Sequence, residues 1–321
     1  MDVFAIGTPV VDYFARADEK YLAKQKLTSG ATNFVSRKKL DAMQKALGKS
    51  IFHVGAGDNA RNVCEGVCRL GGSAVYAGMI GKDEEGKEFA HSLKSNFVQN
   101  RLALGEGRTG KIVCLITDDG QRTFAADLGN GLNFAEFGDE EAVADSGFFY
   151  LTSITLSGKT KVAKLASGLM GIAKREGCKI ALSLESPPLV KRNRKMLLGA
   201  AKKCDLLFLN EEELEAFCGE SDESRQYLFL QKNLPYAAVF VKRGENGSAV
   251  LCGGELLTIP AYHASVLDTT GAGDSYAAGV IYGLSQGHNC ERAGKLGAHL
   301  ASLVIGKYGA GMPKEISRLV V

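Results

Sequence analysis

The chain has 321 residues, 45% of them apolar and 23% charged, and its 39 basic and 36 acidic residues leave a formal net charge of +3. This composition is typical of an ordinary globular protein with one large domain, and no apolar run approaches the roughly 18 residues that a membrane-spanning helix needs. The start of the chain lacks the pattern of a signal peptide, and the longest basic cluster, residues 191–195, is interpreted as an exposed helix face rather than a nucleic-acid site. We therefore expect a cytoplasmic protein with neither a membrane nor a nucleic-acid partner.

Eight cysteines are spread from Cys64 to Cys290, with no C-x-x-C pair and no histidine at metal-ligand spacing. Most lie in apolar surroundings such as "KIVCLIT" around Cys114, where a thiol behaves as a small apolar side chain. The sequence therefore predicts reduced, structural cysteines and no transition-metal site.

The first 130 residues do not follow a regular alternation of strand and helix. A polar, lysine-rich stretch separates "FAIGTPVVDYFA" from "SIFHVGAGDN", and residues 109–127 are typical of a hairpin that turns at Asp119-Gly120. These features predict a small β-rich lid, formed by residues of about 13–55 and 105–130, over a larger sheet. One domain with a lid is preferred over two independent domains.

From residue 148 onward, short apolar runs alternate with helical patterns. The helix after the first run has apolar residues from Val162 to Ile172 at helical spacing and a stop at Gly177. Such alternation predicts an α/β fold with a parallel sheet, whose ligands bind at the carboxyl ends of the strands. The expected strands are 148–152, 179–184, 206–209 and 237–242, and the expected helices between them are the one with this Val162–Ile172 spacing and those around 189–203 and 211–217.

The segment 267–284 carries an acidic, glycine-rich turn into a helical pattern that begins near Ala272. Amide groups at a helix start favour an anion, and glycines let a ligand approach the backbone closely. Two roles are possible for Asp274 here. It is either a simple helix cap, or the base that accepts the proton of an attacking hydroxyl while the turn amides stabilise a transferring phosphoryl group.

Several motifs then match one family in order along the chain. The string Asp268-Thr-Thr-Gly-Ala-Gly-Asp274 resembles the D-T-x-G-A-G-D signature of the ribokinase-like (PfkB) family of small-molecule kinases. Other matches are "GDNARNVCEGVCRLGG" at 57–72, "NEEE" at 210–213, "VKRGENG" at 241–247 and "GKYGAGMP" at 306–313. The segments "GTPVVD" at 7–12, "RTFAADLG" at 122–129 and "AGKLGAHLAS" at 293–302 are similar to the adenosine-kinase-like branch. The resemblance implies a ribokinase-like three-layer α/β/α domain over residues 1–321, with a mostly parallel central sheet.

The resemblance implies the catalytic roles as well. Asp274 is expected to be the general base, and Gly271, Ala272 and Gly273 are expected to form the anion hole. An aspartate near its ordinary pKa of about 4 is a weak base toward an alcohol. Positioning and charge neutralisation are therefore expected to do most of the catalysis.

Charge neutralisation implies Mg²⁺, with ATP as the phosphate donor. Asn210 and Glu213 match the family's N-x-x-E, which holds Mg²⁺ largely through water. The same spacing fits a capping box in which Asn210 opens a helix, and the two roles can coexist. The resemblance also implies K⁺ held by backbone carbonyls of Asp268 and Thr270.

On the nucleotide side, the resemblance implies that Gly244 and Gly247 shape the turn beneath ATP, with Thr270 beside it. Lys242 is expected to reach the phosphates. An ordinary hairpin turn with a solvated lysine is the alternative.

On the acceptor side, Asp12 and Asn62 match positions that hold sugar hydroxyls. A turn at a strand end and a helix cap are the alternatives for these two residues. Gly57 and Asp58 stand where the family has two adjacent glycines, so Asp58 is expected to narrow the acceptor site and to disfavour a phosphorylated acceptor. Thr8 departs from the asparagine common in the adenosine-kinase-like branch.

The predicted function is transfer of the γ-phosphate of ATP to the primary hydroxyl of a nucleoside, by a monomer or homodimer. A kinase for ribose, fructose or a related free sugar is the first alternative. The second is a non-catalytic protein that senses a nucleoside or sugar.

Overall fold

The computed structural model describes residues 1–306 and 309–312. It contains two sheets, and the larger one has nine strands in the order β14-β13-β12-β11-β10-β9-β1-β5-β6. The strands from β6 to β12 are parallel, while β13 and β14 add an antiparallel edge. The strands are β1 Val3–Ile6, β5 Ala74–Gly81, β6 Gln99–Gly105, β9 Phe148–Thr152, β10 Lys179–Ser183, β11 Leu206–Asn210, β12 Ala238–Lys242, β13 Ser248–Cys252 and β14 Glu255–Ile259.

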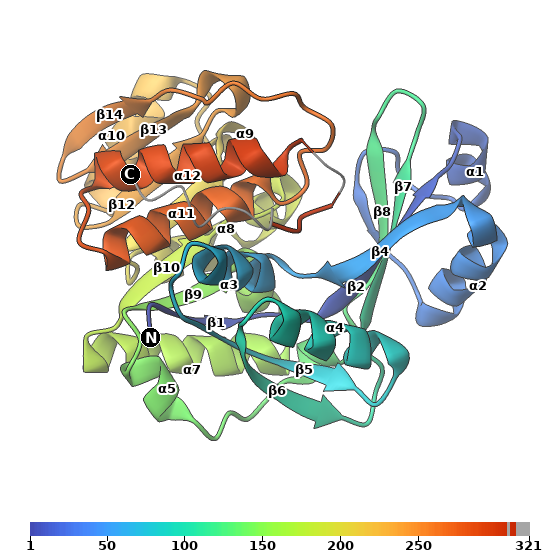
Figure 1. Cartoon of the computed structure of the whole chain (residues 1–321). Coiled ribbons are helices and arrows are strands. Elements are labelled where there is room, and N and C mark those ends of the chain that lie inside the picture. The colour runs from blue at the N-terminus through green and yellow to red at the C-terminus, as the bar shows by residue number, and fades with distance from the viewer. Residues whose placement is uncertain (307–308, 313–321) are drawn as a thin grey trace.

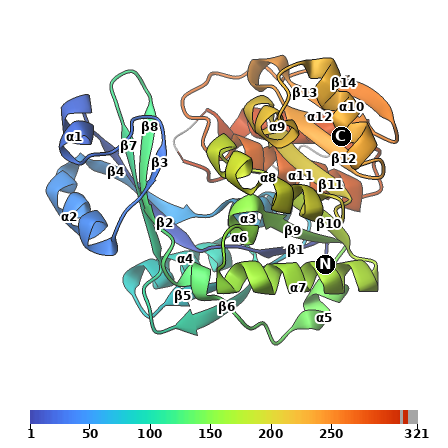
Figure 2. The ribbon, with the colours of Figure 1, turned by 180° about the vertical axis from the view of Figure 1, so that it is seen from behind.

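Helices cover both faces of the large sheet. Figure 1 shows α3, α4, α11 and α12 on one face, and Figure 2 shows α5 to α9 on the other. Each face has its own apolar core, as parallel sheets require. The helices are α3 Asn59–Arg69, α4 Glu84–Ser95, α5 Glu140–Ala144, α6 Ser153–Leu156, α7 Lys161–Glu176, α8 Pro187–Ala201, α9 Glu211–Cys218, α10 Glu223–Asn233, α11 Ala272–Ser285 and α12 Cys290–Val304, with 3-10 turns η2 Gly129–Asn133 and η3 Gly244–Asn246. The expected three-layer α/β/α fold is confirmed.

The strands and helices expected after residue 148 are present within a few residues of their predicted bounds. Helix α7 ends where Gly177 adopts φ +78°, a left-handed conformation that glycine takes without strain. The segment 306–313, which resembles the family's final loop and exit strand, lies only in part within the described residues.

The second sheet has five strands in the order β3-β8-β7-β2-β4 and projects from one side of the molecule (Figure 1). Its β7–β8 hairpin turns where the sequence predicted. The lysine-rich segment, which showed no clear pattern, forms two helices, and these pack on the sheet around Leu22 and Leu40. The elements are β2 Val10–Arg16, α1 Glu19–Lys24, β3 Thr32–Phe34, α2 Arg37–Leu47, η1 Gly48–Ser50, β4 Ile51–Gly57, β7 Gly110–Ile116 and β8 Arg122–Asp127.

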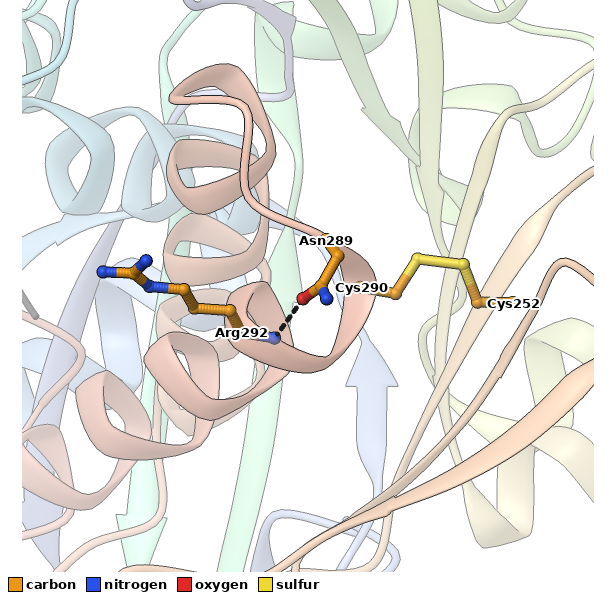
Figure 3. The surroundings of a disulfide bond; sticks show 4 residues. All are labelled: Cys252, Asn289, Cys290 and Arg292. Atoms are coloured by element: carbon orange, nitrogen blue, oxygen red, sulfur yellow. Dashed lines mark hydrogen bonds between the residues drawn. A yellow bond between two sulfur atoms is a disulfide. The ribbon is translucent and has the colours of Figure 1, made fainter.

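The prediction that all cysteines are reduced is wrong for one pair. Cys252, the last residue of β13, forms a disulfide with Cys290, the first residue of α12 (Figure 3). The two are 38 residues apart in sequence, and their Cα atoms come within 6.6 Å because α12 packs against β13 and β14. This proximity is tertiary, so spacing rules could not find it. The other six cysteines are free.

No helix within residues 1–306 and 309–312 is long and apolar enough to cross a membrane.

Candidate active site

Two clefts meet at the start of α11. The first, of about 560 Å³, lies between the second sheet and the carboxyl ends of β9, β10, β11 and β12. The second, of about 580 Å³, lies between the turn after β12, helix α12 and the loop 261–269. Lys242 and Gly273 line both clefts. Carboxyl ends of parallel strands are where α/β sheets bind ligands, so this junction is the candidate site.

The junction is built by the tight turn into α11. Gly271 adopts φ +78°, and a Cβ there would lie 2.6 Å from Cβ of Ala310, so only glycine fits. A Cβ at Gly273 would lie 2.9 Å from Nζ of Lys242, which shows how closely the lysine covers the turn. The Ala272 amide donates to the Thr269 carbonyl at 3.2 Å, so this member of the predicted anion hole already has a partner. The turn and its lysine together present positive charge to both clefts.

Asp274 lies in the first turn of α11 and is buried at the floor of the first cleft. Its Oδ2 accepts a hydrogen bond of 2.8 Å from Nδ2 of Asn62 on α3. Burial raises the pKa of Asp274 to about 7, against the opposing effects of the Asn62 hydrogen bond and the nearby Lys242. The weak base expected from the sequence is therefore stronger in the fold, with a pKa suited to accepting a proton near neutral pH.

Gly57 on β4 pairs directly with Val10 on β2, and Asp12, two residues further along β2, lines the first cleft. The Asp12 carboxylate covers Gly57 so closely that no Cβ fits at that position. Burial raises the pKa of Asp12 to about 7; Arg61 opposes the rise, and Asp58 adds to it. Gly57 therefore packs against the Asp12 side chain and does not itself line the first cleft.

Asp58 lines the first cleft, as the sequence predicted, with a backbone φ of +111° that is rare for any residue but glycine. Its carboxylate accepts a 2.5 Å hydrogen bond from Oη of Tyr76 and leaves no room for a side chain at Gly7. Burial raises the pKa of Asp58 to about 6, although the Tyr76 hydrogen bond opposes the rise. Asp58 therefore adds a carboxylate to the cleft at the cost of local backbone strain.

Asn210 and Glu213 lie together at the end of β11 and the start of α9. Oδ1 of Asn210 accepts from the Glu213 amide, and Oε2 of Glu213 accepts from the Asn210 amide, both at 2.8 Å. This is the capping box that the spacing allowed, and both residues also line the first cleft. Burial raises the pKa of Glu213, while Lys242 acts to lower it.

The predicted nucleotide residues divide between the two clefts. Gly244 and Gly247 line the second cleft with positive φ angles of +55° and +79°, and Gly247 has no space for a Cβ against the Ile259 carbonyl. Thr270 lines the first cleft instead. Tyr262 lines the second cleft, and its ring stacks on that of His299 of α12 with ring centroids 4.5 Å apart. A flat aromatic surface of this kind suits a nucleotide base.

Asp268, another predicted site residue, stabilises the turn before α11 through hydrogen bonds to its side chain. It accepts hydrogen bonds from the amides of Gly309 (2.8 Å) and Thr270 (2.9 Å). Burial acts to raise its pKa, but these hydrogen bonds hold it below the ordinary value. Asp268 is therefore an ionised anchor for the turn.

Two residues of the site were not found from the sequence. Arg122 on β8 reaches from the second sheet to the turn, with hydrogen bonds of 2.6 Å to Asp268 Oδ1 and to Thr269 Oγ1 and a further contact to Thr270. Glu185, just after β10, lines the first cleft. Arg122 lies in the quoted segment 122–129, so that segment held a signal; Glu185 stands in "SLESPP", which matches no motif.

The fold and the site define a phosphotransferase with an alcohol group as acceptor. Residues 32–316 match the family model described as pfkB family carbohydrate kinase, and the chain belongs to that family. Kinases of this family use ATP as the phosphate donor.

Solved structures and curated relatives agree with this assignment. The chain is similar to the adenosine kinase of Sinorhizobium meliloti (29% identity, TM-score 0.88, covering 97% of this chain and 95% of that one). It is also similar to a probable sugar kinase of Rhizobium etli CFN 42, with 28% identity and a TM-score of 0.90 over 98% of this chain and 96% of that one. A curated relative, the 5-dehydro-2-deoxygluconokinase of Geobacillus kaustophilus, is 28% identical over 78% of this chain and 79% of its own. These relatives span nucleoside, sugar and sugar-acid kinases, so they leave the acceptor open.

Proposed function

We propose that the protein transfers the γ-phosphate of ATP to the primary hydroxyl of a nucleoside. The main support for this proposal is the position of Asp274. It lines the first cleft together with Gly273 and Lys242, and these two residues also line the second cleft. ATP in the second cleft would present its terminal phosphate to this junction. An acceptor in the first cleft would place its hydroxyl beside Asp274. An ATP donor also supports the cytoplasmic location expected from the sequence.

The first cleft has two unlike walls, which supports a nucleoside over a free sugar. The wall from the second sheet carries the apolar side chains of Phe34, Ile112 and Phe124, with Asp12 of β2 in the same sheet. The opposite wall carries Asn62 and Asp274. A nucleoside has a flat apolar base and a hydrogen-bonding ribose, and so matches both walls.

The proposed reaction uses the groups at the junction in order. Asp274 accepts the proton of the acceptor hydroxyl as its oxygen attacks the γ-phosphorus, and the bond to the leaving ADP oxygen breaks. The positive turn at Gly271–Gly273 and the Lys242 ammonium stabilise the charge on the transferring group. The second sheet acts as a lid, held over the cleft by Arg122, and excludes water as a competing acceptor.

The donor set fits Mg²⁺ held through water. The capping box uses one oxygen of Glu213 and the amide oxygen of Asn210, and the second Glu213 oxygen remains for a hydrated ion. Among the described residues, no three His, Cys, Asp or Glu side chains are grouped to bind a metal directly. When bound, Mg²⁺ supplies charge neutralisation at the phosphates. K⁺ at the Asp268 and Thr270 carbonyls is also proposed, and equal rates in K⁺ and a bulky organic cation would contradict it.

The test is phosphoryl transfer from ATP and Mg²⁺ to a panel of nucleosides and free sugars. Adenosine, guanosine, ribose and fructose are compared with the Asp274→Asn variant alongside. We expect a nucleoside to be the best acceptor and the variant to lose roughly 10³-fold or more in kcat while still binding ATP. Preference for fructose or ribose would favour the sugar-kinase alternative, and ligand binding without turnover would favour a sensor.

A further inference from the structure

Glu185 is a buried carboxyl group that the proposed chemistry leaves without a role. Its side chain is only 9% exposed, yet it lines the first cleft. Oε1 accepts a hydrogen bond from Nδ2 of Asn59. Oε2 is fully buried and has no hydrogen-bond partner within residues 1–306 and 309–312. Buried polar atoms are nearly always paired, so an unpaired one at the wall of a ligand cleft points to a ligand group.

The backbone holds Glu185 firmly in this place. Its amide donates to Oγ of Ser153 at 2.9 Å, which fixes the segment after β10 to α6. The next residue, Ser186, has φ +61°, an unfavourable value for a non-glycine residue. Strain of this kind persists where the surrounding structure enforces a functional position.

The charges around Glu185 define what it can bind. Five carboxyl groups and two cations line the first cleft; the acidic residues are Asp12, Asp58, Glu185, Glu213 and Asp274, and the basic ones are Arg122 and Lys242. Arg122 is already paired with Asp268, and Lys242 lies over the Gly273 turn. Burial, followed by Asp274, Asp58 and Glu213, raises the pKa of Glu185 well above its ordinary value, with the Thr152 hydroxyl opposing. Among the described residues, Arg122 and Lys242 are the only Lys or Arg side chains that line this cleft.

We propose, resting on the function above, that Glu185 recognises the acceptor by pairing its free oxygen with a hydroxyl or amino group, and that the cleft rejects acceptors bearing a carboxylate or phosphate. A direct metal ligand is the other use of a buried carboxylate. The described residues offer no group of three metal-ligating side chains, so this use is not supported.

The proposal separates this chain from one class among its relatives. A 5-dehydro-2-deoxygluconokinase takes, by its name, a sugar acid. A sugar acid would bring its carboxylate into a cleft that already holds five carboxyl groups. Like charges brought together in a cleft partly shielded from water repel strongly. We therefore expect a neutral acceptor here, rich in hydrogen-bond donors.

The experiment measures KM for acceptor and for ATP in wild type, Glu185→Gln and Glu185→Ala. The acceptors are the best neutral nucleoside or sugar from the panel and 5-dehydro-2-deoxygluconate. Loss of the hydrogen bond from Glu185 should raise the KM for the neutral acceptor by up to about tenfold, with the KM for ATP within about twofold. In both variants, the ratio of the KM for the sugar acid to the KM for the neutral acceptor should also be smaller than in wild type. Glu215→Gln, on the exposed side of α9, is the matched control and should leave all values unchanged.

Three results would overturn the inference. The first is an unchanged KM for the neutral acceptor in both variants, and the second is a wild-type preference for the sugar acid. The third is an equal rise in both KM values together with a lowered melting temperature, which would show a structural role. If wild type phosphorylates no acceptor, the proposed function itself fails, and this is visible before any variant is made.

Discussion

Asn62 and Asp274 are 212 residues apart in sequence, and their side chains meet through a hydrogen bond of 2.8 Å. The other end of the Asn62 amide accepts from Nη1 of Arg61 at 2.8 Å. A guanidinium only donates and an ionised carboxylate only accepts, so the amide has one orientation. Arg61 is itself held by Glu65 at 2.8 Å and by Ser92 Oγ at 2.7 Å. Asp274, the proposed base, is therefore oriented by a chain of hydrogen-bonded side chains that runs through Asn62, Arg61 and Glu65.

Arg61 is expected to be a positioning residue. Arg61→Gln should lower kcat by roughly 10- to 100-fold, because a small displacement of Asn62 misaligns Asp274. It also leaves Glu65 buried without its ion-pair partner, so stability falls as well. The double variant Arg61→Gln/Glu65→Gln should recover melting temperature but not kcat. Recovery of both, with an unchanged pH profile, would show that Arg61 serves the fold alone.

Activity should depend on pH through Asp274. The carboxylate must be ionised to accept a proton, and burial places its pKa at about 7. The kcat/KM for the acceptor should therefore rise about tenfold per unit from pH 5 to 6.5 and level off above about pH 8. Asp12, with its pKa also at about 7, steepens the same limb if its ionised form binds the acceptor. Initial rates in buffers of constant ionic strength test this, and a flat profile from pH 5.5 to 8 would contradict it.

Arg122 should control closure of the second sheet. It makes charged hydrogen bonds with Asp268 and further hydrogen bonds with Thr269 and Thr270, so Arg122→Ala loosens the connection between the two sheets. We expect about a tenfold rise in KM for the acceptor and measurable ATP hydrolysis without acceptor, because water gains access. Arg101→Ala, which removes the more exposed pair with Asp139, is the control and should change neither. Equal hydrolysis in wild type and Arg122→Ala would rule out this role.

The Cys252–Cys290 disulfide should stabilise the fold. It closes a loop of 38 residues, for which the chain-entropy estimate is about 4 kcal/mol at 25 °C. Urea unfolding with and without dithiothreitol measures this as a lower midpoint in the reduced protein. The Cys252→Ser/Cys290→Ser variant should have the urea midpoint of the reduced protein, and dithiothreitol should not change that midpoint. Eight free thiols by mass spectrometry of the untreated protein would contradict the bond.

The sequence predicted best where local patterns carry the information. Strand–helix alternation after residue 148 reflects burial on both faces of a parallel sheet, and the start of α11 reflects glycine conformations; both are local. The helix α1 was missed because it has only six residues, and α2 because few of its eleven residues are apolar, with Leu40, Met43 and Leu47 buried against the second sheet. Glu185 was missed because a lone charged residue has no pattern, whereas Arg122 lies in the matched segment 122–129 but was given no role there.

The sequence by itself determined the α/β architecture, the turn at Gly271–Gly273 and the residue types needed for phosphoryl transfer. Only the tertiary structure decided that burial raises the pKa of Asp274 to about 7, that Asp58 accepts a hydrogen bond from Tyr76, and that Cys252 meets Cys290. The physical reason is that burial, charge proximity and side-chain pairing depend on distances between residues far apart in the chain. Helix and strand patterns depend on neighbours, and the sequence displays those directly.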